Sequence, residues 1–125
     1  MIGGSNQHLL FITHRPNNID VIDLNTFQYL NIDNIKHNTL PVSENNRVSF
    51  HCFVSISKEK EKKMKNESEF LLMSRGETLL IRYDEKNKEF SYQTLSCISS
   101  LRDCNDYTFA YWNHSIFIFG GYDHK

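Results

Sequence analysis

Short apolar runs recur along this chain, and polar turn residues bound each of them. The clearest runs lie within His8–Thr13, Glu69–Ser74 and Ser115–Phe119. Runs of this length are too short for helices and are typical of strands covered on both faces, where polar and apolar residues no longer alternate. The feature predicts an all-β chain. The presence of a single alanine, the best helix former, agrees with this.

Strand-turn-strand units follow the first two runs. The turns are expected at Asn25-Thr26 and Glu85–Lys88, where asparagine supplies turn chemistry. In the last strand the residues alternate, which predicts a sheet with one wetter face. The strands expected around these turns cover, in chain order, Asn18–Leu24, Phe27–Ile32, Thr78–Asp84 and Phe90–Leu95.

Different strand types return in the same order. Arg47–Val54 resembles Asp106–Trp112, fifty-nine residues later, and the apolar runs at Leu9 and Leu71 are sixty-two residues apart. Between the copies lies Lys58–Glu69, a nearly continuous charged segment that cannot bury a face. We interpret it as a solvated loop insertion; the alternative is a short docking helix or a regulated loop with Ser68 as a modification site. Without it the period falls to about 48, within the range of propeller blades.

Composition excludes several classes of partner. The net charge of −1 provides no basic excess for a nucleic acid backbone. No apolar run is long enough to span a membrane, and the N-terminus lacks the features of a signal peptide. Cys52, Cys97 and Cys104 form no CxxC pair and are expected to be reduced thiols. We therefore expect a cytoplasmic protein.

The residues that could support catalysis or metal binding do not form a convincing site. His51 and Cys52 are neighbours on an expected strand, so their side chains point to opposite faces. Asp20 and Asp23 are not expected to be a catalytic pair, since Asp23 is better explained as a turn residue. Asp103 and Asp106 are not expected to be one either, since they are expected to lie in a loop of Cys, Asn and Asp residues. We predict no catalytic residue, no cofactor and no metal site. The six histidines lack the spacing of metal ligands: His8, His14, His37, His51, His114 and His124.

An aromatic group near the C-terminus has two expected roles. Tyr107, Phe109 and Tyr111 share one face of a strand, and core packing is the favoured interpretation over a ligand platform. Trp112 opens the following turn and is left as a candidate contact residue.

The segment Ile116–Asp123 resembles the signature of the Kelch repeat, an apolar second strand that ends in a double glycine, here Gly120 and Gly121. The Kelch third strand ends in a Tyr-Asp pair, which Tyr83 and Asp84 match. The aromatic that follows in that family is matched by Phe90. In the earlier repeat, Phe27 follows Asp23 after a turn interpreted as shorter.

These signature residues also have expected physical roles. The glycines would let the chain bend and let backbones approach. The aromatic residue would fill the space between blades. Asp84 would accept hydrogen bonds from the amides of the following turn.

The resemblance implies antiparallel Kelch-type β-propeller blades and an incomplete propeller over residues 1–125. Residues 8–32 would form a partial blade, and residues 107–121 would begin a third. Residues 47–95 would form a full blade with the charged insertion at 58–69. Because closed propellers have about four to eight blades, further blades in the same protein or self-association are expected.

The function implied is a non-catalytic scaffold that presents inter-strand loops to a protein partner. The loops considered are Asp33–Asn46, Lys58–Glu69 and Ser96–Asn105. One alternative is a fragment of a propeller-fold enzyme, oxidase-like or sialidase-like, although the five arginines do not recur at equivalent positions. A small self-contained β-sandwich is the other.

Overall fold

A computed structural model describes residues 1–42, 52–56, 66–74, 77–95, 104–113 and 115–123. Among these residues the only helical element is the 3-10 helix η1 (Ile32–Asn34), and all named strands pair antiparallel. None of the described elements is a helix long and apolar enough to cross a membrane. The expected all-β, antiparallel fold class is confirmed.

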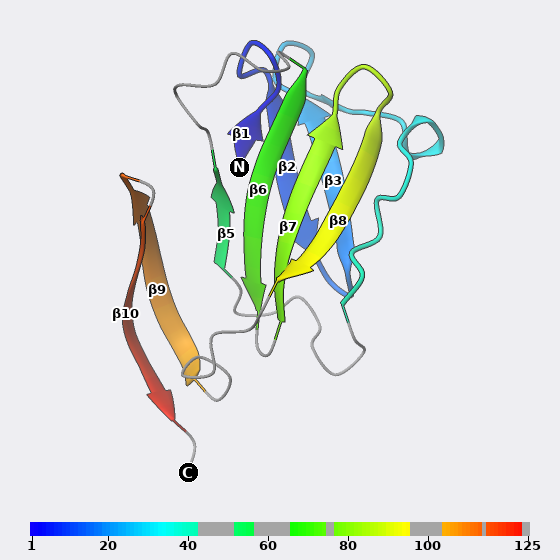
Figure 1. Ribbon diagram of the computed structural model, residues 1–125. Helices are drawn as coiled ribbons and strands as arrows, with labels where there is room; N and C mark the ends of the chain where they lie inside the picture. The colour runs from blue at the N-terminus through cyan, green and yellow to red at the C-terminus, as the bar shows by residue number, and fades with distance from the viewer. Residues whose placement is uncertain (43–51, 57–65, 75–76, 96–103, 114, 124–125) are drawn as a thin grey trace.

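The first sheet has four strands in sequence order (Figure 1). They are β1 (Ile2–Gly3), β2 (Leu9–His14), β3 (Asn18–Asp23) and β4 (Gln28–Tyr29). The sequence predicted the last three, and the structure adds β1, which pairs with β2. The strand expected over Phe27–Ile32 is reduced to two residues, since Phe27 has a left-handed φ of 55° and Ile32 begins η1.

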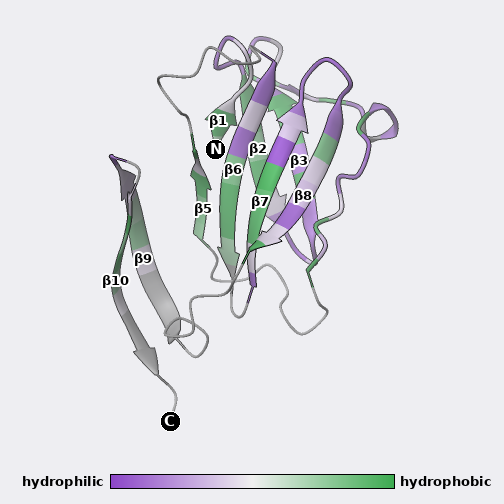
Figure 2. Ribbon diagram, viewed as in Figure 1, coloured by the Kyte–Doolittle hydropathy of each residue, from purple (hydrophilic) through white to green (hydrophobic). Residues whose placement is uncertain are grey.

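The second sheet repeats this order with longer strands. It contains β5 (Cys52–Ser55), β6 (Glu67–Ser74), β7 (Glu77–Asp84) and β8 (Glu89–Leu95). The charged insertion predicted over 58–69 therefore extends too far, because its last three residues belong to β6. Hydrophobic residues occupy much of β6 and β7, and hydrophilic ones gather toward the β7–β8 turn (Figure 2).

The third sheet has two described strands, β9 (Cys104–Trp112) and β10 (Ser115–Asp123). Their pairing runs from Ser115 opposite Trp112 to Asp123 opposite Cys104. The double glycine does not end β10 as expected. Gly120 has a left-handed φ of 72°, yet a Cβ there would meet no atom within 4 Å. Its backbone conformation, and not crowding, is what favours glycine at this position.

The main core lies between the first and second sheets. Phe11 of the first sheet sits 4.5 Å from Phe70 and 5.2 Å from Tyr83, between ring centroids. Tyr83 and Phe90 are themselves 4.7 Å apart and buried. The packing role expected of Phe90 is confirmed, whereas Phe27 is 81% exposed and fills no space between sheets.

A smaller core joins the second sheet to the third. The buried residues Cys52, Val54 and Met73 pack against half-buried Phe109 and other residues of β9 and β10. Leu71, Tyr111, Ile116 and Ile118 complete this cluster. The core roles expected of Cys52, Phe109 and Tyr111 are confirmed, and the side chain of Tyr107 lies outside the described part. The three sheets thus stack face to face in chain order.

The segment between β4 and β5 ties the first two sheets together. Ile35 and Leu40 are buried in the main core. Lys36 bridges to Glu89 of the second sheet, and the Phe90 amide donates to the Lys36 carbonyl at 3.0 Å. This described part of the loop predicted at Asp33–Asn46 is therefore a structural connection as well as a surface.

Candidate interaction surface

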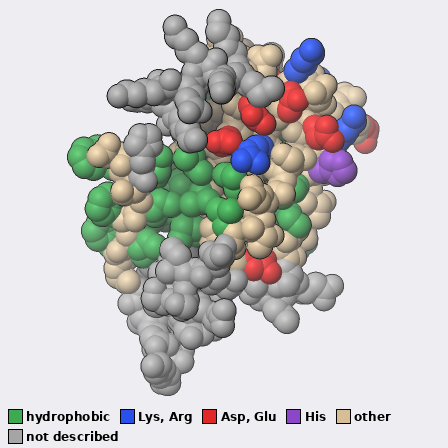
Figure 3. Space-filling view, viewed as in Figure 1, with side chains coloured by type: hydrophobic (Ala, Val, Ile, Leu, Met, Phe, Trp, Pro, Cys, Tyr) green, Lys and Arg blue, Asp and Glu red, His purple; other side chains and the backbone are tan. Residues whose placement is uncertain are grey.

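The β1–β2, β3–β4 and β7–β8 turns emerge at one end of the molecule (Figure 1). In an antiparallel sheet whose strands follow sequence order, the connection from the first to the second strand and that from the third to the fourth lie at the same end of the sheet. We call this end, formed by residues 4–8, 24–27, 66–67 and 84–88, the turn surface. Charged side chains gather toward it (Figure 3).

The same turn is built twice on the turn surface. The Asn25 amide donates to Asp23 Oδ1 at 2.8 Å. In the second sheet the amides of Lys86 and Asn87 donate to Asp84 Oδ1, at 2.9 and 3.1 Å. Asn87 also donates through Nδ2 to Asp84 Oδ2, at 2.6 Å. The bonds from Asn87 hold the pKa of Asp84 below its usual value. The predicted roles of Asp23 and Asp84 as turn formers are confirmed.

These turns correct one alignment made from the sequence. The fourth residue after each aspartate has a left-handed φ, 55° at Phe27 and 51° at Lys88. Two residues later, Tyr29 pairs with Ile22 as Phe90 pairs with Tyr83. Tyr29, and not Phe27, is therefore the counterpart of Phe90. The equal spacing of six residues from each aspartate was visible in the sequence.

A polar network links the two sheets beneath the turn surface. The carboxylate of Glu85 accepts a hydrogen bond from the Ser5 amide at 2.8 Å and lies 3.4 Å from His8 Nε2. The Gly4 amide donates to Ser68 Oγ at 2.8 Å. Ser68, considered in the sequence as a modification site, thus takes part in an inter-sheet contact.

A shallow pocket of about 310 Å³ opens on the turn surface. Carboxylate, amide and ammonium groups line it and provide charged and hydrogen-bonding contacts. The β7–β8 turn and the start of β6 line it through Asn66, Glu67, Asp84, Lys86 and Asn87.

The histidines that the structure describes pair with carboxylates instead of converging. His8, His14 and His37 lie 3.4, 2.9 and 3.4 Å from Glu85, Asp20 and Glu89. Within the described ranges, no three His, Cys, Asp or Glu side chains form a group able to hold a metal. His51, His114, His124 and Asp103 fall outside these ranges, as does the side chain of Asp106.

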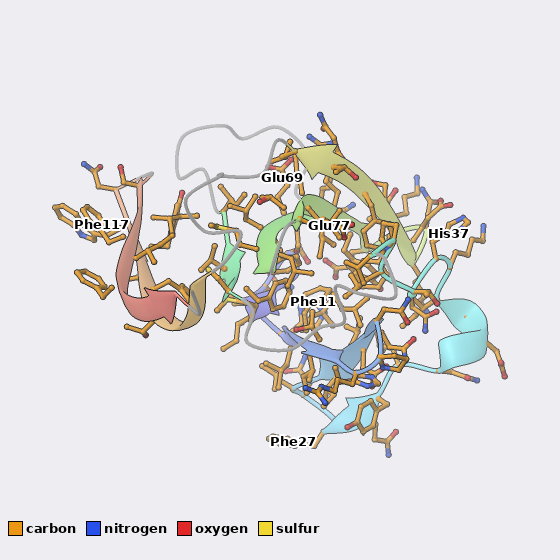
Figure 4. The ribbon with its side chains drawn as sticks, turned by 90° about the horizontal axis from the view of Figure 1, so that it is seen from below. Phe11, Phe27, His37, Glu69, Glu77 and Phe117 are labelled. Carbon is orange, nitrogen blue, oxygen red and sulfur yellow. The ribbon has the colours of Figure 1, made fainter. Side chains whose placement is uncertain are left out.

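A second exposed surface lies on the outer side of the third sheet. Phe117, Phe119 and Trp112 are 45%, 55% and 72% exposed. Phe117 pairs with Ala110, and Ser115 with Trp112, so their side chains share this face. Phe117 points away from the other two sheets (Figure 4). Phe27 likewise points outward, away from the body of the first sheet. The sequence analysis left Trp112 as a candidate contact residue and did not single out the two phenylalanines beside it.

No family model, curated protein or solved structure matches this chain.

Proposed function

We propose that this chain is a non-catalytic, cytoplasmic protein-binding module made of Kelch-type propeller blades, and that it presents its turn surface to a protein partner. The repeated turn is the observation that supports this best. Asp23 and Asp84 close equivalent turns at the same end of two stacked sheets. A scaffold that repeats a turn in this way holds polar loops in fixed positions.

The charged and amide side chains that line the pocket supply the proposed contact chemistry. Glu67 and Lys86 lie on its rim, so the partner would offer complementary charges and hydrogen-bonding groups there. Opposed charges across an interface mainly determine which partner binds and how fast it associates.

The test compares two charge-reversal variants in affinity capture followed by titration of the captured protein. Glu67→Lys combined with Lys86→Glu keeps the net charge but reverses the pattern on the turn surface. Arg15→Glu, an exposed residue in the β2–β3 connection at the opposite end, is the control. We expect the first variant to lose at least about tenfold in affinity, as for loss of one good polar contact, and the control to bind normally. Equal effects of the two variants would contradict binding through the turn surface.

A further inference from the structure

The stacking of the three sheets follows one rule. Alignment on Asp23 and Asp84 makes Ile22 equivalent to Tyr83 and Tyr29 equivalent to Phe90. In the second sheet, the face that carries Tyr83 and Phe90 is buried against the preceding sheet, and we call it the leading face. The opposite face, the trailing face, packs on the following sheet through Cys52, Val54 and Met73. The interface between the first two sheets therefore joins a trailing face to a leading face. In the third sheet we call the side that packs on the second sheet the leading face, from its position.

The leading face of the first sheet has no described sheet against it. One cross-strand row on it is formed by Ile2, Leu10, Ile22 and Tyr29. The first and last of these are 49% and 64% exposed, and the two between them are half-buried. The row is apolar, and it corresponds to the row of the second sheet formed by half-buried Ser68 and buried Tyr83 and Phe90.

The trailing face of the third sheet is the complementary free end. Phe117, Phe119 and Trp112 are exposed on it, and Thr108, Ala110 and Ser115 add no charge. This face corresponds to the trailing face of the first sheet, on which Phe11 packs against the second sheet. Exposed apolar surface of this kind marks an interaction site, and in this chain such a face is twice covered by a leading face.

We propose that the trailing face of the third sheet packs against the leading face of the first sheet in a second copy of this chain. The contact is head to tail and joins unlike faces, as does the interface between the first two sheets. A symmetric pairing of two trailing faces would join like faces, which the interface between the first two sheets does not. Two copies would together hold six sheets, within the four to eight of closed propellers. The inference goes beyond the proposed protein partner, because it uses different residues.

The test rests on complementation between two variants, followed by light scattering on a sizing column. Phe117→Lys with Phe119→Lys blocks the trailing face, and Ile2→Lys with Tyr29→Lys blocks the leading face. All four side chains are exposed in the single chain, so the fold should survive. Phe27→Lys is the matched control, since Phe27 is more exposed but lies in a turn whose counterpart is Lys88.

We expect the wild-type chain and the control to have at least twice the mass of one chain. Each blocked variant alone should be monomeric, with association weakened by about a hundredfold or more, as for the loss of two buried apolar side chains. Their mixture should give a one-to-one dimer that grows no further, because each variant retains the face that the other lacks.

Three outcomes would overturn the proposal. A wild-type chain that is monomeric at all concentrations would show that a second copy does not cover these faces, and that another protein or another segment does. A leading-face variant that still assembles by itself would indicate a symmetric contact. Blocked variants that fail to combine would exclude the head-to-tail pairing. Far-UV circular dichroism verifies the fold, and Phe117→Ser with Phe119→Ser replaces the lysine pair if that pair unfolds the chain.

Discussion

Replacement of Phe11 by alanine should remove much of the stability that joins the first two sheets. The side chain is 1% exposed, and its ring lies 4.5, 5.2 and 6.2 Å from those of Phe70, Tyr83 and Phe90. Burial of a phenylalanine contributes about 1.5–3 kcal/mol, and favourable aromatic pairs add about 0.5–1.5 kcal/mol each beyond that, without strict additivity. Phe11→Ala also leaves a cavity, so we expect a loss of about 4 kcal/mol.

Urea unfolding followed by far-UV circular dichroism measures this loss. With a slope of about 2 kcal/mol per molar urea, the midpoint should fall by about 2 M. Phe27→Ala is the control, because Phe27 lies in the β3–β4 turn of the same sheet and is 81% exposed. The free energy of unfolding of this control should differ from that of the wild type by less than about 0.5 kcal/mol.

The reasoning assumes that the two sheets unfold as one unit around a shared core. If Phe11→Ala shifts the midpoint no more than Phe27→Ala does, the packing between the sheets contributes little and the argument is refuted. A transition that splits into two steps in wild type would also refute it, because loss of Phe11 would then weaken only one sheet.

Three further outcomes follow from individual residues. Gly3→Ala should lower stability by about 1–3 kcal/mol in thermal melts, because the new Cβ would lie 2.9 Å from Ser68 Oγ and 3.1 Å from the Phe11 and Phe70 rings. The lowered pKa of Asp84 gives stability that is present above about pH 4 and is lost as pH falls through the folded value, so Asp84→Asn should flatten the acid dependence of the urea midpoint. Burial raises the pKa of Cys52 to about 12, so the contribution of this thiol to the stability of the fold should fall as pH rises above about 8.5. Mass spectrometry should find the buried thiol alkylated only after unfolding.

The apolar runs and turn residues were enough to predict most strands. Leu9–His14 and Glu77–Asp84 form where β-branched, aromatic and leucine residues cluster between turns, and Asp84 accepts the turn hydrogen bonds expected of it. The strand β1 could not be predicted, because it has two residues and is fixed by pairing with β2 and by the close approach that Gly3 permits. Local sequence contains no record of such contacts.

The surfaces were harder to predict than the strands. Ile35 and Leu40 are isolated apolar residues in a polar segment, and their burial depends on two sheets that are distant in sequence. Phe27 was assigned a packing role because the turn was counted one way, whereas the backbone places Tyr29 in that position. The exposed faces of the first and third sheets became visible only when the stacking order was known.

The stacking order has a consequence for hydrogen exchange. β6 has a paired strand on each edge and a packed sheet on each face, so its amides should exchange only when the chain unfolds globally. β10 pairs with β9 on one edge, and no other described strand protects its second. In an array whose units contact only their neighbours, opening starts at the ends. Protection should therefore decrease from the second sheet outward, and the amides along the free edge of β10 should exchange first among those of the strands.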